Sequence, residues 1–145
     1  MQLRAVDHSV NIISYQKDGR KYAMCCAWVM MVDYDKLLCL LGSQSETAKH
    51  IKSNDIIGVS SLSTNQKDIA IKLGEGHSNL VDKLDGIDYK LDGNAITILN
   101  SKTELICEVI DVLHLKEIES DSLLYLRIIK HKENEKASFL HMEDF

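Results

Sequence analysis

Hydroxyl groups gather in one short segment of the chain, between two apolar stretches, in a pattern that could bind an anion. The side chains concerned are those of Ser43, Gln44, Ser45 and Thr47. If a helix begins here, its first N–H groups are unpaired and its N-terminus carries a partial positive charge, so the hydroxyls could complete a phosphate site. They could also do no more than cap the helix, because Ser43 and Glu46 have the spacing of a capping box. Both interpretations follow from the turn itself.

Thiols and imidazoles are the other side chains that could do chemistry, but their spacing does not favour a metal site. The four cysteines, which include no Cys-x-x-Cys pair, are Cys25, Cys26, Cys39 and Cys107. The six histidines are scattered along the chain, without the close pairs or cysteine partners that zinc sites use. Adjacent residues of a strand point to opposite faces, so a disulfide between Cys25 and Cys26 would be strained. We therefore predict reduced thiols and no metal site.

β-Strands are the main elements predicted to hold these groups in place. Asp18-Gly19 separates two β-prone stretches, residues 10–16 and 21–32, and predicts a two-residue hairpin turn. Residues 37–41 form an apolar run too short for a stable helix, which predicts a buried strand leading into the hydroxyl-rich turn. Residues 21–32 are apolar on both faces, as expected of a strand with a core on one side and a partner or ligand on the other. Further strands are expected over residues 56–59, 95–99, 105–115, 124–129 and 137–141, and short helices near Ser43, Ser63 and Ser78.

Length, charge and hydropathy exclude several classes of protein. The chain has 145 residues, which predicts a single domain over residues 1–145. Its net charge is −5, so it lacks the cationic face that a nucleic-acid partner requires. It has no apolar run near the ~20 residues that span a bilayer, and its first ten residues lack the apolar core of a signal peptide. We therefore expect a cytoplasmic protein with no nucleic-acid or membrane partner.

The order of the predicted elements indicates a barrel. Strands separated by hairpin signals, with short helices only in the middle of the chain, favour a closed antiparallel β-barrel decorated by helices.

With these motifs in their order, the chain resembles the flavin reductase-like family of FMN-binding split β-barrels. Members of that family have a strand reading roughly Asn-Ala-Met-Thr-Ala-Ser-Trp, and residues 22–28, YAMCCAW, stand in its place. The similarity covers about residues 10–130. The other matching segments are residues 37–51 (LLCLLGSQSETAKHI), 56–74 (IIGVSSLSTNQKDIAIKLG), 78–84 (SNLVDKL) and 105–109 (LICEV).

The resemblance implies a fold, a cofactor and an activity. The fold is mainly β, a closed antiparallel split β-barrel of Greek-key type with two or three short helices. FMN would bind in a groove at a homodimer interface, with its ring system against residues 23–28 and its phosphate at residues 43–47, and the protein would be an oxidoreductase. No catalytic residue is named. The cofactor-binding residues implied are Met24, Cys25, Cys26, Ala27, Trp28, Ser43, Gln44, Ser45, Thr47 and Lys49.

Two departures from the family pattern bear on the choice of activity. Cys25 and Ala27 replace hydroxyl residues of the family, so backbone N–H groups would carry more of the hydrogen bonding to the flavin. Many NADH-dependent relatives have Gly-Asp-His before their last strands, where this chain has Ser120-Asp121-Ser122. The missing histidine favours an electron-transfer flavoprotein over an NAD(P)H:flavin reductase, with NAD(P)H or a redox protein as the donor. A non-catalytic flavin-binding or interaction barrel is the third alternative.

Overall fold

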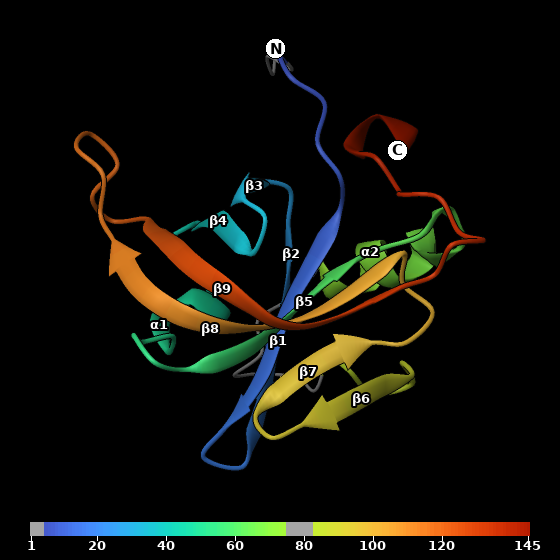
Figure 1. The fold of residues 1–145 in the computed structure, drawn as a ribbon, viewed down its shortest axis with the longest axis horizontal. Coiled ribbons are helices and arrows are strands. Elements are labelled where there is room, and N and C mark those ends of the chain that lie inside the picture. Colours follow the sequence, from blue (N-terminus) through green and yellow to red (C-terminus); the bar gives the residue numbers. More distant parts are fainter. Residues whose placement is uncertain (1–4, 75–82) are drawn as a thin grey trace.

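The computed structural model describes residues 5–74 and 83–145, and within them the protein is mainly β with few helical turns (Figure 1). The strands are β1 (Asn11–Lys17), β2 (Arg20–Cys26), β3 (Val29–Asp33), β4 (Lys36–Leu41), β5 (Ile56–Ser61), β6 (Tyr89–Asp92), β7 (Ala95–Ile98), β8 (Thr103–Leu113) and β9 (Ser122–Glu133). The helical segments are α1 (Glu46–Lys49), the 3₁₀ turn η1 (Thr64–Gln66), α2 (Lys67–Leu73) and the 3₁₀ turn η2 (Met142–Asp144). The helix predicted near Ser78 begins outside the described residues. No helix in the described part of the chain is long and apolar enough to cross a membrane.

All strand pairs are antiparallel and belong to one sheet. The hydrogen-bonded order is β3-β4-β9-β8-β5-β1-β7-β6, and β2 pairs with β1 outside this path. Within the described residues the pairing forms an open path, so the closure of the barrel stays a prediction. The Leu40 N–H donates to the Trp28 carbonyl across 2.9 Å and so extends the β3–β4 ladder by one residue toward the end of β2.

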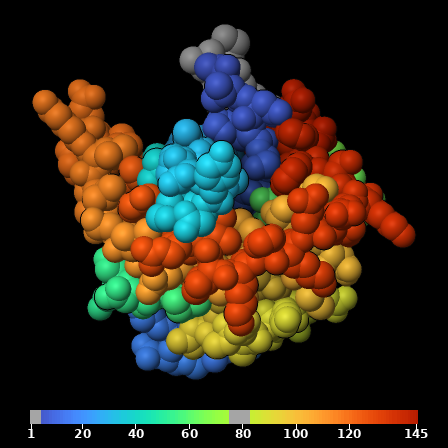
Figure 2. Space-filling view, viewed as in Figure 1, coloured from blue at the N-terminus to red at the C-terminus, as the bar shows by residue number. Residues whose placement is uncertain are grey.

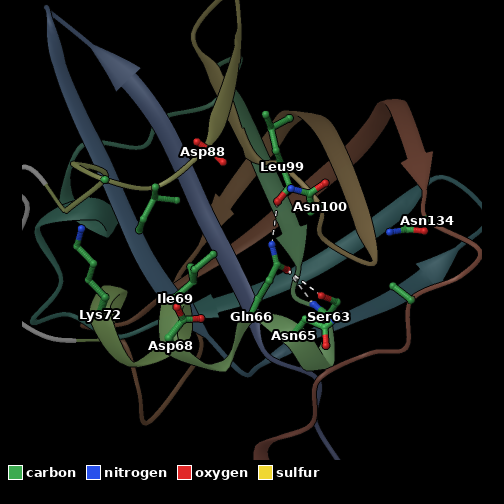
Figure 3. Close-up of a pocket in the computed structure, with 13 residues that line it drawn as sticks. Ser63, Asn65, Gln66, Asp68, Ile69, Lys72, Asp88, Leu99, Asn100 and Asn134 are labelled. Carbon is green, nitrogen blue, oxygen red and sulfur yellow. Dashed lines mark hydrogen bonds between the residues drawn. The ribbon is translucent and has the colours of Figure 1, made fainter.

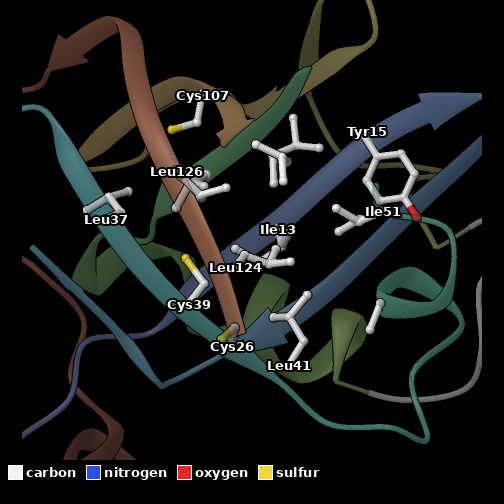
Figure 4. Close-up of a cluster of buried hydrophobic side chains, with 14 of the residues drawn as sticks. Ile13, Tyr15, Cys26, Leu37, Cys39, Leu41, Ile51, Cys107, Leu124 and Leu126 are labelled. Carbon is white, nitrogen blue, oxygen red and sulfur yellow. The ribbon is translucent and has the colours of Figure 1, made fainter. Parts of the chain in front are cut away.

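Six strands surround the larger of two hydrophobic cores. Side chains from β1, β2, β4, β5, β8 and β9 fill it, together with Ala48 of α1 and Ile51 after it. Figure 4 shows Cys26, Cys39 and Cys107 reaching this core from three different strands. All three are buried and carry free thiols.

β1 is the wall that this core shares with a second one. Ile13 points into the first core, whereas Ile12 points to the opposite face and packs with Leu73 of α2 and Ile98 of β7. The alternation follows from the two-residue period of a strand. β5 and β7 approach so closely here that a Cβ on Gly58 would lie 1.7 Å from the Ile96 carbonyl oxygen.

The first hairpin is confirmed and the strand that follows it is shorter than predicted. Asp18 and Gly19 have φ values of 54° and 78°, as a two-residue hairpin turn with both central residues left-handed requires. The prediction of one strand over residues 21–32 is wrong. β2 ends at Cys26, opposite Asn11 of β1, and the chain then turns so that β3 pairs with β4.

The break at residues 27–28 leaves the apolar side chains of β3 at the surface. Trp28, Met30 and Met31 are each more than half exposed, and Tyr34 in the following turn is 98% exposed. Figure 2 shows the β3–β4 hairpin, in cyan, standing on the surface between the β8–β9 arm and the N-terminal segment. The predicted strand at residues 137–141 forms only isolated bridges, Ser9–His141 and Ser63–Phe139.

Candidate functional site

The end of β2 lies between the two α-helices. The Ser45 hydroxyl, at the start of α1, donates to the Met24 sulfur across 3.1 Å. The Cys25 thiol donates to the Ala70 carbonyl of α2 across 3.5 Å. Because consecutive strand residues point to opposite faces, α1 and α2 cover opposite faces of β2, as Figure 1 also shows. The structure therefore brings the two segments predicted to bind the flavin into direct contact, through Met24 and Ser45.

Ser45 caps α1, and the capping box predicted from Ser43 and Glu46 is wrong. The Ser45 hydroxyl accepts a hydrogen bond from the Ala48 N–H across 3.3 Å. The Glu46 carboxylate instead faces along α1 toward His50 and Lys49, with atoms 3.2 and 3.5 Å away. The hydrogen bond from His50 is the main cause that holds the pKa of Glu46 below its ordinary value. The first turn of α1 is thus capped by Ser45, two residues later than the box predicted.

The hydroxyl-rich turn presents only part of its predicted donors to solvent. Ser43, Gln44 and Lys49 are exposed, and Ser45 is half-buried. Thr47 is 2% exposed, and its carbonyl accepts a 2.5 Å hydrogen bond from the Tyr15 hydroxyl. An anion that approaches from solvent would therefore meet Ser43, Gln44 and Lys49, whereas Thr47 belongs to the core.

The predicted ring-binding segment changes from buried to exposed along its length. Met24, Cys25 and Ala27 are half-buried, Cys26 is buried, and Trp28 is 55% exposed. Burial raises the pKa of the Cys25 thiol to about 11 and that of Cys26 to about 12. Both groups stay protonated at neutral pH, so they act as small apolar residues rather than as nucleophilic thiolates.

Asp121 is a residue of the site that the sequence analysis did not assign to it. Its carboxylate accepts the Ser43 N–H across 3.0 Å, and its carbonyl oxygen lies 3.0 Å from Nδ1 of His114. The antiparallel pairing of β4 with β9 sets Leu41 opposite Ser122, which brings the two turns together. No local spacing signals this contact, because it joins segments that are far apart in the sequence.

Two cavities lie outside the predicted residues. One, of about 590 Å³, is beside α2 and is lined by Asp68, Lys72 and Asn100 among others (Figure 3). Gln66 also lines this cavity, and its side chain accepts a hydrogen bond from the Ser63 N–H and donates one to the Leu99 carbonyl. The other, of about 500 Å³, is lined by side chains of β3, β8 and β9 and the start of β1. Neither of these two cavities includes any of the ten predicted flavin-binding residues.

Comparison with family models matches nearly the whole chain to one family. A family model described as flavin reductase like domain matches residues 3–144. No match is found among curated proteins. Among solved structures, the NADH:FAD oxidoreductase SgcE6 of Streptomyces globisporus C-1027 is 14% identical with a TM-score of 0.84, over 94% of this chain and 81% of that one.

Two further solved structures show the same fold. The flavoredoxin of Methanosarcina acetivorans is 14% identical, with a TM-score of 0.77, over 100% of this chain and 92% of that one. A flavin reductase domain protein of Arthrobacter sp. FB24 is 13% identical, with a TM-score of 0.76, over 93% of this chain and 82% of that one. At these identities the likeness establishes the fold.

Proposed function

Because this chain belongs to the flavin reductase-like domain family, whose model spans residues 3–144, we propose that it is an FMN-binding oxidoreductase that transfers electrons through its flavin. The observation that carries the proposal is the contact of Met24 with Ser45, which joins the segment proposed for the ring system to the turn proposed for the phosphate. A bound flavin supplies the electron chemistry, whereas the protein binds and orients it.

The donor set of the turn fits a phosphate on its exposed side. Within the described residues, neither the Ser43 nor the Gln44 side chain forms a hydrogen bond, and both are exposed. Lys49 adds a positive charge, part of which Glu46 neutralises. Asp121 holds the Ser43 N–H and so fixes the shape of the turn, which leaves side chains as the donors toward the ligand. A phosphate bound this way would be recognised mainly by Ser43, Gln44 and Lys49.

The ring-binding segment fits a flat, mostly apolar ligand. Met24, Cys25 and Ala27 are small or flexible and half-buried. Among the described strands β2 pairs with β1 alone, so its other edge carries no paired strand. A ring system along this edge could accept hydrogen bonds from main-chain N–H groups and contact these side chains. Neither of the two cavities described above includes these residues, and a second copy of the chain would complete a groove along this edge.

An absorbance spectrum tests the proposal. The purified protein is titrated with FMN and then mixed anaerobically with NADH or NADPH. We expect the titration to perturb the flavin spectrum. We expect the flavin absorbance to fall only slowly after either nucleotide is added, because a redox protein is the better electron donor in this proposal. Loss of flavin absorbance at several turnovers per second, within the usual enzyme range of ~1–1000 per second, would instead assign the protein as an NAD(P)H:flavin reductase. A protein that leaves the FMN spectrum unchanged is a barrel without flavin, and the proposal fails.

A further inference from the structure

Lys83 lies where β2 meets the C-terminal end of α2. Its Nζ donates a hydrogen bond to the carbonyl of Leu73, the last residue of α2, across 3.2 Å. Cys25, on the face of β2 that is turned to α2, bonds the carbonyl of Ala70 one turn earlier in the same helix. A cation at the C-terminal end of a helix is in a favourable position, because the exposed carbonyls there carry a partial negative charge.

The surroundings of Lys83 are partly dehydrated, and the described part of the chain offers it no negative side chain. Burial lowers the pKa of Lys83 from its ordinary value, although the Cys25 thiol group acts to raise it. Among the described residues no carboxylate pairs with its ammonium, whose hydrogen bond goes to a main-chain carbonyl. An ammonium has three N–H donors, and the described residues accept only one of them from Lys83, which leaves two that could bind a ligand. A half-buried cation with spare donors is a favourable neighbour for an anionic group.

We propose that Lys83 is the cation of the flavin site and that it stabilises the reduced flavin more than the oxidised one. The inference rests on the proposed function, since Cys25 is one of the residues proposed to contact the ring system. The turn at Ser43–Ser45 serves the Met24 face of β2, and Lys83 serves the Cys25 face. The site therefore has phosphate donors on one side and a positive charge on the other.

The physical reason is electrostatic. The ring system of a flavin carries more negative charge when it holds two more electrons, so a fixed positive charge beside it favours that state. The partial burial of Lys83 strengthens the effect, because the charge is screened less than it would be in water. Lys83 acts here on the affinity of the two oxidation states and moves no proton.

The test is the reduction potential of bound FMN in Lys83→Met, measured by anaerobic equilibration with a reference dye. We expect the affinity for reduced FMN to fall about tenfold more than that for oxidised FMN, a downward shift of about 30 mV for a two-electron couple. Lys83→Gln keeps a donor for the Leu73 carbonyl without the charge and should give the same shift. Lys83→Arg keeps the charge and should retain the wild-type potential.

Lys72→Met is the matched control. Lys72 also donates to a main-chain carbonyl, that of Asp85, but it lines the cavity of about 590 Å³, which contains none of the residues proposed to bind the flavin. An equal shift in Lys72→Met, or a wild-type potential in both Lys83→Met and Lys83→Gln, overturns the inference and leaves flavin binding intact. A wild-type protein that binds no FMN overturns the proposed function, and the inference falls with it.

Discussion

At the scale of single residues, the hydroxyl turn could be recognised from the sequence because its donors are neighbours in the chain. Asp121 and Lys83 could not be recognised from the sequence. The pairing of β4 with β9 brings Asp121 to the turn, and the position of α2 brings Lys83 to β2. The structure also separates the predicted phosphate donors that are exposed from those that are buried or cap the helix. Ser45 caps α1 and Thr47 is buried, so Ser43 and Gln44 are the side chains left to test.

We predict that replacing Ser43 and Gln44 together by alanine weakens FMN binding and leaves riboflavin binding unchanged. Riboflavin lacks the phosphate, and each hydrogen bond to a charged group contributes ~1.5–3 kcal/mol, so FMN affinity should fall at least about tenfold. Both side chains are exposed, so the unfolding temperature should stay the same. Ser138→Ala, an exposed serine elsewhere, is the control. Equal weakening of both ligands in a fluorescence titration would show that the turn does not bind phosphate.

We predict that burial of the Cys107 thiol makes the protein less stable at alkaline pH. Burial raises the pKa of Cys107 from 9.0 to about 12, so the unfolded chain releases this proton at lower pH than the folded protein does. The stabilising contribution is complete below pH 9 and is lost as the pH rises toward 12, by ~1.4 kcal/mol per pH unit. Cys107→Ala removes this contribution. Urea unfolding at about pH 8 and about pH 10.5 should show a fall in the free energy of unfolding that is ~2 kcal/mol smaller in the variant. The same fall in both proteins would refute the assignment.

At the scale of elements, the sequence predicted the turns whose shape depends on neighbouring residues, and it did not predict where strands end through pairing with distant strands. Asp18-Gly19 specifies its hairpin through two left-handed residues, which the sequence alone can indicate. The end of β2 at Cys26 depends on which strand comes next to which, because Val29 pairs with Cys39 of β4. Apolar residues continue through the break, so periodicity could not reveal it. That break separates Trp28 from the segment that contacts Ser45.

We predict that Gly58→Ala is strongly destabilising. A Cβ there would lie 1.7 Å from the Ile96 carbonyl oxygen, which forces β5 and β7 apart and disturbs the 2.7 Å bond from the Ser14 hydroxyl to the same oxygen. We expect a loss of at least ~2 kcal/mol in the free energy of unfolding. Gly42→Ala is the matched control, since nothing lies within 4 Å of its added Cβ. A Gly58→Ala protein that unfolds at the wild-type urea concentration would contradict the close approach.

At the scale of the whole molecule, the exposed apolar side chains of β3 need an explanation. Among the described strands, β3 ends the sheet path and pairs only with β4, and Met30 and Met31 are 61% and 55% exposed. An apolar strand at a sheet edge is a liability unless something covers it. The sequence indicated this surface through the two-sided apolar character of residues 21–32. It could not indicate that the exposed part would be the separate strand β3.

We predict that β3 forms part of a homodimer interface and that FMN binding depends on the dimer. Light scattering at micromolar concentration should give twice the chain mass of 16.4 kDa. Met30→Lys with Met31→Lys places two charges in the interface and should give monomers, because a buried unpaired charge is strongly unfavourable. Leu91→Lys, at a 44% exposed apolar residue of β6, is the control and should stay dimeric. If a second copy completes the flavin groove, the monomeric variant also loses FMN affinity, and wild-type affinity falls on dilution. A wild-type monomer that binds FMN with an affinity independent of protein concentration would show that one chain forms the whole site.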